Sequence, residues 1–584
     1  MVADEQSVGA ALARIAAVRG AAPAIRTLDR VVTYEELDRT SAAIARWLVA
    51  QGHGRGKSTV LIASGVDYIL TYFGIVRAGN RAVPIEPRFR GEQLRRIVAS
   101  TGVSLAIVDA QGREAFASLD EAPPLLDVDT VVTEGSTSTS GPLPDVSRDT
   151  ELCVLFSSGS TGFPKGVILT HAAGLGRAAL MTRVYGAGKR HLVFTPLVYA
   201  YGLIDGTLAP LLHGGETLLL GSYNPTRFKE MVTKLQPQIV LGVPFLYKHL
   251  GSMGIDLLAG LAEVKNCLYY TTGEPLPRAV ATTFEARYGV PIRQNYGLSE
   301  ISALAADLHD APPVPSRVGK IIPGVEVTFV SDQGEVDVEM GELWVKRSPL
   351  FMKGYVEGTE VVEGRMTAEY YKTGDIGRVD KDGYLELMGR NDDFVSVGGV
   401  RIHPAETENV LLAIPGVLEA AFVVERDLDT GNQSTRAYVV LDPTHGPTAA
   451  ELDRRVKAEL PPSRWPQHIE ISAGLPRTDT GKLVRRRLVE RQDERLVATA
   501  EIIVELPAAR LEGMLLDVSR NGCMIEVYAE ITSGTPARIS LRTDHALTLE
   551  GVLRHVVTEG DAFRAGVSFT STDKALIERF IAAR

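Results

Sequence analysis

One segment in the first third of the chain, LFSSGSTGFPKGVILTH at Leu155–His171, has an unusual composition. Six small residues in succession, Ser157–Gly162, precede a single lysine, Lys165. Hydroxyl groups, glycine N–H groups and one ammonium can hold a polyphosphate, because glycine lets the backbone approach the phosphate oxygens. The segment lacks the spacing G-x-x-x-x-G-K-[ST], so it is not a Walker loop. Apolar runs on both sides indicate a phosphate-binding loop between buried strands rather than a surface linker.

Length and charge limit the possible classes of protein. The chain has 584 residues, and this length predicts roughly three to four domains. A net charge of −10 and a pI near 5.7 argue against a nucleic-acid partner, because proteins that bind nucleic acids usually present a basic surface. Cys153, Cys267 and Cys523 lie far apart and form neither a disulfide framework nor a metal motif, so we expect a cytoplasmic protein.

The longest apolar segment is LVFTPLVYAYGLIDGTLAPLL at Leu192–Leu212. It is long enough to cross a bilayer, but it contains Pro196, Asp205 and Pro210. The aspartate alone would cost about 3 kcal/mol at the centre of a bilayer. We therefore expect a buried strand and helix beside a pocket, and no membrane span. The N-terminus is acidic at its start and lacks the apolar core of a signal peptide.

The pattern along the chain changes twice. Helical spacing at Val32–Gly52 and short apolar runs such as STVLIASG and SLAIVDA predict a mostly parallel sheet with helices on its faces. After about residue 310 shorter strand-like segments dominate, and a mixed α and β pattern returns from Arg401. A basic stretch, Leu483–Arg495, then leads to a last part that predicts several strands and a closing helix.

Six motifs in one order resemble the adenylate-forming superfamily, which comprises acyl- and aryl-CoA synthetases, peptide-synthetase adenylation domains and beetle luciferases. SSGSTGFPKGV resembles its phosphate loop. The other matching segments are those for adenine (Thr271–Pro277 and Asn295–Glu300), ribose (Tyr371–Asp375), the hinge and thiol tunnel (Gly389–Glu408) and the catalytic lysine (Pro476–Lys482).

The resemblance implies an α/β multidomain fold and a two-step reaction. It implies a large domain at 1–389 with sheets flanked by helices plus a β-barrel, and a small mobile α+β subdomain at 390–490. A carboxylate would attack the α-phosphorus of ATP to give an acyl-adenylate and pyrophosphate. A thiol, that of CoA, would then attack the acyl carbon and release AMP.

Four residues would carry the first step. Thr161 and Lys165 would hold the β- and γ-phosphates, because such displacements are accelerated mainly by positioning and charge neutralisation. Glu300 would help to hold Mg²⁺, a hard cation that favours oxygen ligands. Lys482 matches the lysine that bridges the substrate carboxylate and the phosphate, although a lone lysine is normally a solvated surface group.

The remaining positions would bind the nucleotide and the thiol. Tyr296 offers a face to adenine, and Asp375 suits the ribose hydroxyls because a carboxylate accepts two hydrogen bonds. Arg390 would contact the ribose, and Asp392 matches the hinge on which the small subdomain pivots. The full binding set comprises Ser157, Ser158, Gly159, Ser160, Gly162, Gly273, Glu274, Tyr296, Gly297, Ser299, Asp375, Arg390, Gly398 and Gly399. Of these, Ser299 replaces the usual threonine, and the paired glycines at 398–399 would let the pantetheine arm pass.

The acid pocket is less defined by the motifs. Tyr199 stands where many relatives have a histidine, which leaves the substrate open. Asp205 could meet an α-amino group, but the surroundings are apolar, so we favour a hydrophobic aliphatic or aromatic acid over an amino acid. The apolar residues expected there are Leu203, Leu208, Val243 and Phe245.

The last part of the chain, 491–584, resembles the PilZ domain, a small all-β barrel that binds cyclic di-GMP. Its R-x-x-x-R motif is Arg491 and Arg495, and its D-x-S-x-x-G motif is Asp517, Ser519 and Gly522. Two arginines can form forked bonds to phosphates and stack on guanine. The alternative is a solvated helix of mixed charge.

Three functions are compatible with these motifs. The first is a ligase that activates a hydrophobic acid with ATP and Mg²⁺, transfers it to CoA and is regulated by cyclic di-GMP. The second loads an external carrier protein instead of CoA. The third is a catalytically silent signalling scaffold, which the retention of Lys165, Glu300, Asp375, Arg390 and Lys482 disfavours.

Overall fold

The computed structural model describes residues 5–569 except at a set of gaps. These gaps are 139–140, 158–164, 222, 253–261, 275, 309–312, 314–316, 332, 358–359, 363–364, 391–394, 398–399, 403, 427–432, 443–445, 473, 477–482, 484, 486–487, 489–495, 508, 519–521, 528–534, 542–543 and 560–561. The chain divides into two compact units, one of residues 1–420 and 441–465 and one of residues 421–440 and 466–584.

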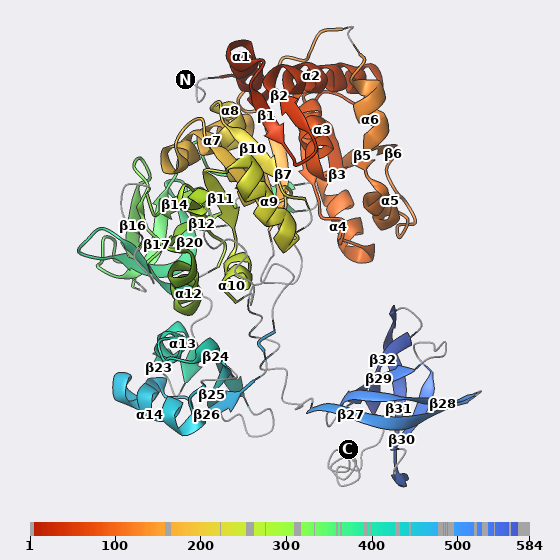
Figure 1. The fold of residues 1–584 in the computed structure, drawn as a ribbon, viewed down its shortest axis with the longest axis vertical. Helices are drawn as coiled ribbons and strands as arrows, with labels where there is room; N and C mark the ends of the chain where they lie inside the picture. Colours follow the sequence, from red (N-terminus) through yellow and green to blue (C-terminus); the bar gives the residue numbers. More distant parts are fainter. Residues whose placement is uncertain are drawn as a thin grey trace. The chain divides into compact units, whose positions relative to one another are not determined.

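The first unit is built on two large sheets covered by helices (Figure 1). The nine strands of one sheet are, in sheet order, β15 (Lys320–Ile321), β14 (Ser302–Ala306), β13 (Ile292–Leu298), β12 (Leu268–Thr271), β11 (Ile239–Gly242), β9 (Arg190–Val193), β10 (Glu216–Leu219), β1 (Pro23–Arg26) and β2 (Val31–Thr33). The eight strands of the other are β19 (Glu360–Val362), β18 (Gly354–Glu357), β8 (Lys165–Thr170), β7 (Glu151–Ser157), β4 (Arg81–Pro84), β3 (Ser58–Ile62), β5 (Val103–Val108) and β6 (Leu125–Asp127). Most neighbouring pairs in the middle of both sheets are parallel, as predicted.

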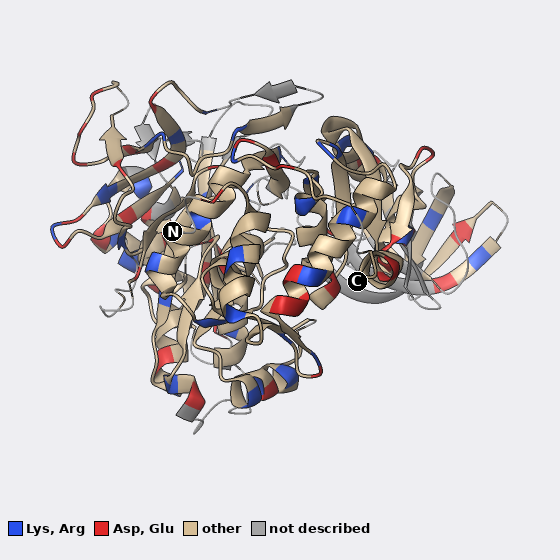
Figure 2. Ribbon diagram, turned by 90° about the horizontal axis from the view of Figure 1, so that it is seen from above, with Lys and Arg blue, Asp and Glu red and all other residues tan. Residues whose placement is uncertain are grey.

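Helices of this unit cover both large sheets, and two further helices near its end pack on each other. Their bounds are α1 (Val8–Arg19), α2 (Tyr34–Ala50), α3 (Gly65–Arg77), α4 (Gly91–Thr101), α5 (Ala110–Phe116), α6 (Val128–Gly135), α7 (His171–Tyr185), α8 (Ala209–Leu212), α9 (Pro225–Leu235), α10 (Pro244–Ser252), α11 (Ala262–Lys265), α12 (Arg278–Tyr288), α13 (Pro404–Leu412) and α14 (Ala449–Glu459). Charged residues of both signs are interspersed along the ribbon in Figure 2.

The predicted helix at Val32–Gly52 begins two residues later than expected. Val31–Thr33 pairs with β1 as a short strand, and the Thr33 side chain then accepts the N–H of Glu36 as the helix N-cap. Glu35 and Glu36 in the first turn favour the positive end of the helix dipole. The predicted strands STVLI and SLAIV are confirmed as β3 and β5, and every residue of β3 is buried.

The apolar segment Leu192–Leu212 is a buried strand end, a helix and a short second helix, as the sequence predicts. After β9 the chain forms a π-helix, η2 (Tyr201–Leu208), which continues into α8. Gly202 permits this turn, because a Cβ there would lie 2.3 Å from the Pro196 carbonyl oxygen. Among the described residues, no helix is long and apolar enough to span a membrane.

The β-rich stretch after residue 310 forms a four-stranded antiparallel sheet among the described residues, where the sequence led us to expect a barrel. Its order is β16 (Val327–Val330), β17 (Gly341–Lys346), β20 (Tyr370–Val379) and β21 (Leu385–Arg390). A hairpin of β22 (Val395–Val397) and β23 (Val400–Ile402) follows. A short 3₁₀ helix, η4 (Pro462–Arg464), lies further along the chain.

The second unit contains a small sheet and a closed barrel. The sheet has the order β24 (Val417–Arg426), β25 (Gln433–Leu441) and β26 (His468–Ile471). The barrel closes in the order β27 (Leu496–Leu506), β28 (Ala509–Val518), β29 (Gly522–Val527), β32 (Ala562–Phe569), β31 (Asp544–Glu559) and β30 (Pro536–Leu541). The all-β barrel that the last part of the sequence predicts is therefore present. The closing helix predicted after residue 570 lies outside the described residues.

Candidate active site

The small-residue segment joins two paired antiparallel strands. Ser157 at the end of β7 lies opposite Lys165 at the start of β8, so residues 158–164 connect two ends that are held together. Ser158, Gly159, Ser160, Thr161 and Gly162 lie outside the described residues, as does the side chain of Ser157. The position of the loop between two buried strands agrees with the sequence prediction.

Lys165 and Glu300 meet at the same tyrosine, Tyr355 in β18. The Lys165 Nζ atom lies 5.6 Å from the centre of the Tyr355 ring. The Tyr355 hydroxyl donates to Glu300 Oε1 at 2.8 Å and lies 3.2 Å from the hydroxyl of Tyr371. Burial, together with the Glu300 charge, raises the pKa of both tyrosines, so they remain protonated donors at neutral pH.

The backbone around Glu300 is fixed as firmly as its side chain. Its carbonyl oxygen accepts the N–H of Met352 at 2.7 Å and Arg177 Nη2 at 2.9 Å. Arg177 also donates to the carbonyl oxygen of Ser299. Both Ser299 and Glu300 lie just beyond the end of β13, beside the start of β14.

A second cluster forms around Asp375 in β20. The Tyr296 hydroxyl donates to Asp375 Oδ2, and Arg390 Nε lies 3.1 Å from Oδ1. Burial raises the pKa of Asp375, while the charge of Arg390 lowers it. Gly374 has φ +76°, and a Cβ there would collide with Arg365. The irregularity in β20 just before Asp375 therefore requires glycine.

The adenine segments lie at the ends of β12 and β13. Gly273 follows β12 with φ +90°, and Glu274 is half-buried beside it. The Thr272 hydroxyl donates to the Asn295 carbonyl oxygen at 2.8 Å and so joins the two segments. A Cβ on Gly297 would lie 2.3 Å from the Ser302 carbonyl oxygen, which explains the small residue after Tyr296.

The residues expected in the acid pocket are distributed differently from the prediction. Leu203 and Leu208 belong to the buried core, whereas Phe245 is 60% exposed and Tyr199 is half-buried against that core. Asp205 is also buried, and it accepts the Tyr185 hydroxyl at 2.8 Å. Its carboxyl group is therefore already paired within the core, and a contact with an amino group stays untested.

Several predicted site residues lie outside the described residues. These are Asp392, Gly398, Gly399, Lys482, Arg491, Arg495 and Ser519. Asp517 and Gly522 belong to the adjacent barrel strands β28 and β29, although their side chains are not described. The structure therefore brings Lys165 and Glu300 of the predicted site together in one cluster. It brings Tyr296, Asp375 and Arg390 together in a second cluster.

Magnesium fits this donor set. Among the described residues no group of three His, Cys, Asp or Glu side chains could hold a metal alone. Mg²⁺ is usually bound by one or two carboxylates together with substrate phosphates. Glu300 offers a second carboxylate oxygen, Oε2, that no described donor reaches, and Lys165 lies near the same tyrosine.

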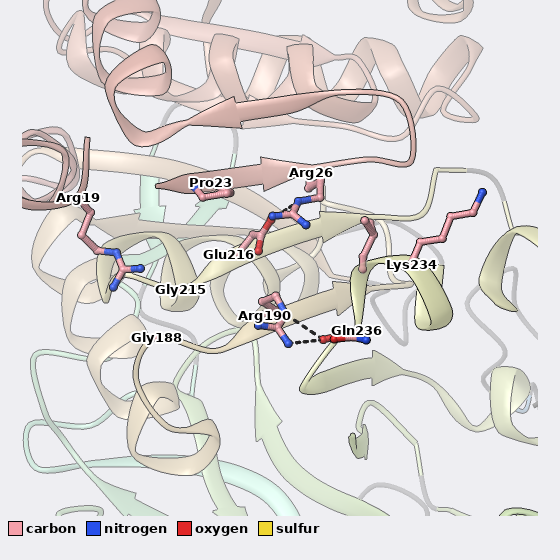
Figure 3. Close-up of a pocket in the computed structure, with 11 residues that line it drawn as sticks. Arg19, Pro23, Arg26, Gly188, Arg190, Gly215, Glu216, Lys234 and Gln236 are labelled. Atoms are coloured by element: carbon pink, nitrogen blue, oxygen red, sulfur yellow. Dashed lines mark hydrogen bonds and ion pairs between the residues drawn. The ribbon is translucent and has the colours of Figure 1, made fainter. Parts of the chain in front are cut away.

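A basic hollow of about 370 Å³ lies elsewhere, at the amino ends of the parallel strands. In Figure 3 Arg26 faces Glu216, and Arg190 bonds to Gln236. The nucleotide segments instead follow the carboxyl ends of β12 and β13, where ligands bind in open α/β sheets. The hollow is therefore separate from the candidate active site.

Sequence reasoning missed Arg177 and Tyr355, which hold Glu300, and Tyr185, which bonds to Asp205 and Asn295. Arg177 could have been noticed, because it is the one charged residue in the apolar run from Ala172 to Met181. Tyr355 and Tyr185 have no local signal, since their partners lie far away in the sequence.

Comparison with known proteins agrees with this geometry. Residues 12–356 match the family model of the AMP-binding enzymes, 406–482 match the AMP-binding enzyme C-terminal domain, and 490–583 match the PilZ domain. The chain is 29% identical to a benzoate–CoA ligase of Thauera aromatica, over 78% of this chain and 90% of that protein. It is 29% identical to a feruloyl-CoA synthase of Amycolatopsis, over 82% and 99%. A long-chain-fatty-acid–CoA ligase of Bacillus subtilis is 26% identical, over 81% and 92%.

Solved structures share the fold. ATP-bound MatB of Rhodopseudomonas palustris superposes with a TM-score of 0.74 at 23% identity, over 83% of this chain and 99% of that one. A benzoate CoA ligase of Burkholderia xenovorans gives 0.73 at 24%, over 82% and 99%.

The chain thus belongs to the AMP-binding enzyme family, with a PilZ domain in its last part. It is an enzyme of the acyl-CoA synthetase class, an AMP-forming acid–thiol ligase.

Proposed function

We propose that the protein activates a hydrophobic carboxylic acid, aromatic or fatty, with ATP and Mg²⁺ and transfers the acyl group to CoA. The observation that carries this proposal is the pair of neighbouring clusters Lys165–Tyr355–Glu300 and Tyr296–Asp375–Arg390. The named relatives act on benzoate, ferulate and long-chain fatty acids, which supports an apolar acid.

In the first step the acid's carboxylate oxygen forms a bond to the α-phosphorus, and the bond from that phosphorus to the β-phosphate oxygen breaks. Lys165 and Thr161 hold the leaving pyrophosphate, and Lys482 bridges the acid and the α-phosphate. Glu300 would hold Mg²⁺, and the ion would supply positive charge beside the phosphates. Asp375 fixes the ribose through its remaining lone pairs, because Tyr296 and Arg390 use one lone pair of each oxygen.

In the second step the CoA sulfur forms a bond to the acyl carbon, the acyl–phosphate bond breaks, and AMP leaves. The thiol proton passes to solvent. Gly398 and Gly399 give room for the pantetheine arm, and Asp392 is the hinge between the two steps. The proposed division is a large domain at 1–389, a mobile subdomain at 390–490 and a PilZ domain at 491–584.

We further propose that cyclic di-GMP binds through Arg491, Arg495, Asp517, Ser519 and Gly522 and regulates the ligase. The match to the PilZ family and the closed six-stranded barrel support this part. Lys482 and Arg491 are close in sequence, so a ligand that orders the arm could bias the mobile subdomain. Such regulation needs different ligand affinity in the two orientations.

Buried free cysteines at 153, 267 and 523 fit a reducing, cytoplasmic compartment.

The test is AMP release from ATP with benzoate, ferulate, octanoate and palmitate, each with and without CoA. We expect CoA-dependent release with one acid class and none from Lys482→Ala. AMP release that needs a carrier protein instead of CoA would contradict the acceptor, and none with any acid would contradict the ligase.

A second assay addresses regulation. Calorimetry should show cyclic di-GMP binding that Arg491→Ala abolishes, whereas Arg538→Ala, an exposed barrel arginine paired with Glu550, should bind normally. Unchanged AMP release at saturating cyclic di-GMP would contradict regulation while leaving the ligase intact.

A further inference from the structure

We propose that Arg177, together with Tyr355, is a positioning residue that aims the Glu300 carboxylate at the metal ion. This inference rests on the proposed function, because that function makes Glu300 the metal ligand. Arg177 lies within α7, which follows β8 directly, and its side chain is almost completely buried.

All three guanidinium nitrogens of Arg177 donate to main-chain carbonyls. Nη1 bonds to the Ser299 oxygen at 2.7 Å and Nη2 to the Glu300 oxygen at 2.9 Å. Nε bonds to the Leu350 oxygen at 2.7 Å. One rigid planar group therefore fixes two successive peptides at the metal ligand and a third peptide from a segment fifty residues later.

The geometry needs arginine and not simply a positive charge. Burial lowers the pKa of Arg177 to about 10, so the group is still charged at neutral pH. Among the described residues it forms no ion pair, and its partners are carbonyl dipoles. A lysine carries a compact point charge and cannot span three carbonyls in a fixed plane.

Residues that follow Leu350 in the sequence also bond to Glu300. Met352 donates its N–H to the Glu300 carbonyl, and Tyr355 donates its hydroxyl to the Glu300 carboxylate. Hydrogen bonds therefore fix both the main-chain carbonyl and the side-chain carboxylate of Glu300. The turn needs such support, because Ser302, two residues on, has the strained φ of +83°.

The same segment also contacts the strand that carries Lys165. Lys353 donates its N–H to the Ile168 carbonyl, and Tyr355 pairs with Val167 in β8. Arg177, Tyr355 and β8 therefore fix the metal ligand and the phosphate lysine on one framework. A residue that orients a metal ligand typically changes metal affinity 10–100-fold when it is altered.

The test measures metal binding directly. Mn²⁺ replaces Mg²⁺, and its free concentration is followed by electron paramagnetic resonance with the full-length protein and α,β-methylene-ATP. We expect Arg177→Lys and Tyr355→Phe each to weaken Mn²⁺ binding by roughly 10-fold or more, as for other residues that orient a metal ligand. Tyr355→Phe keeps the ring and loses only the hydroxyl contact.

The matched control is Arg183→Lys. Arg183 lies on the same helix and also donates to a main-chain carbonyl, that of Pro323 at 3.1 Å, but its side chain is exposed and Pro323 is 23 residues from Glu300 in sequence. We expect its Mn²⁺ affinity to stay within about twofold of the wild type. Circular dichroism melting shows which variants are folded, and if Arg177→Lys unfolds, Tyr355→Phe decides the result.

The outcomes separate this inference from the proposed function. If Glu300→Gln binds Mn²⁺ as tightly as the wild type, the metal role of Glu300 is wrong, and the proposal for Arg177 and Tyr355 is wrong with it. If Glu300→Gln loses Mn²⁺ while folded Arg177→Lys and Tyr355→Phe bind it normally, the proposed function stands and the positioning role is overturned.

Discussion

Asp375 in β20 and Asp205 in η2 both have buried carboxyl groups. They differ in whether their hydrogen-bonding partners reach solvent. Each accepts a hydrogen bond from a tyrosine hydroxyl, Tyr296 for Asp375 and Tyr185 for Asp205. Asp375 also pairs with Arg390, whose side chain is 46% exposed. The buried Asn295 donates to the Tyr185 hydroxyl, so the series of hydrogen bonds that begins at Asp205 ends in the core.

We expect this difference to separate a residue that binds ligand from one that makes a structural contact. Burial raises the pKa of both carboxyl groups, and it raises the pKa of Asp205 to about 7. A perturbed carboxyl beside a tyrosine is therefore not by itself a sign of function. The partner that reaches solvent distinguishes Asp375, because a ligand can approach only from there.

The strongest test of the comparison is Asp375→Ala. Two charge-assisted hydrogen bonds to the ribose are lost, which together are worth about 4 kcal/mol, or about a thousandfold in kcat/KM. The measurement is ATP–pyrophosphate exchange with the preferred acid. Asp205→Asn serves as the control and should stay within about threefold. A loss of less than tenfold for Asp375→Ala would remove the distinction between the two groups.

The next effect is a change in the pH dependence of stability. The folded-state pKa of Asp205 is raised to about 7, so the native state binds the proton more tightly than the unfolded state. Its contribution is complete below about pH 4 and is lost as pH rises through about 7, a change of at most about 4 kcal/mol. Asp205→Asn should therefore gain stability relative to the wild type between pH 5 and pH 8.

Thermal melting of both proteins across that range measures this effect. Asp307, whose pKa is raised to about 6, and His191, whose pKa is lowered to about 4, are present in both proteins and cancel in the difference. A constant difference in melting temperature with pH would show that Asp205 does not titrate in this window.

A smaller effect compares the two tyrosines. Tyr296→Phe removes one hydrogen bond to Asp375 and should raise the KM for ATP about fivefold, for a bond worth about 1 kcal/mol. Tyr185→Phe leaves Asp205 without its donor, so it should lower the melting temperature and leave that KM unchanged. If the two variants exchange these phenotypes, Asp205 and not Asp375 faces the nucleotide.

The smallest expected change is Ser299→Thr. The structure holds residue 299 through its carbonyl, and the hydroxyl is kept in the variant. We expect kcat/KM for ATP within about twofold of the wild type, because the change adds one methyl to a half-buried side chain. Steady-state kinetics measures it, and a tenfold loss would mean that the site is too tight for the usual threonine.

Local patterns predicted most of the fold. Apolar runs bounded by turn residues located β3, β5 and β7, because a strand buried on both faces is apolar along its length, and similar runs located four of the six barrel strands, β27, β28, β29 and β32. The π-helix was missed, since one extra residue per turn leaves almost no trace in an apolar sequence.

The site was predicted unevenly, for a physical reason. Motifs identified Asp375, Glu300 and Lys165 because the chemistry of each is written in its own short segment. Arg177 bonds to carbonyls 122 and 173 residues away, and any residue type can supply a carbonyl. No pattern of side chains could therefore reveal those contacts. Of the residues expected around the acid, Leu203 and Leu208 are buried in the core, and their place in an acid pocket stays a prediction.

The hairpin of β7 and β8 has a consequence for how the chain tolerates change. The pairing of Ser157 with Lys165 closes the ends of the connecting segment, and this pairing does not depend on which residues stand at 158–164. The entropy of closing a loop grows only slowly, by about 0.6 kcal/mol for each doubling of length. Insertions in this segment would therefore leave folding nearly unaffected while displacing the hydroxyl and N–H groups meant for phosphate. Natural or engineered variants of this loop can accordingly remain abundant in the cell after they have ceased to be enzymes.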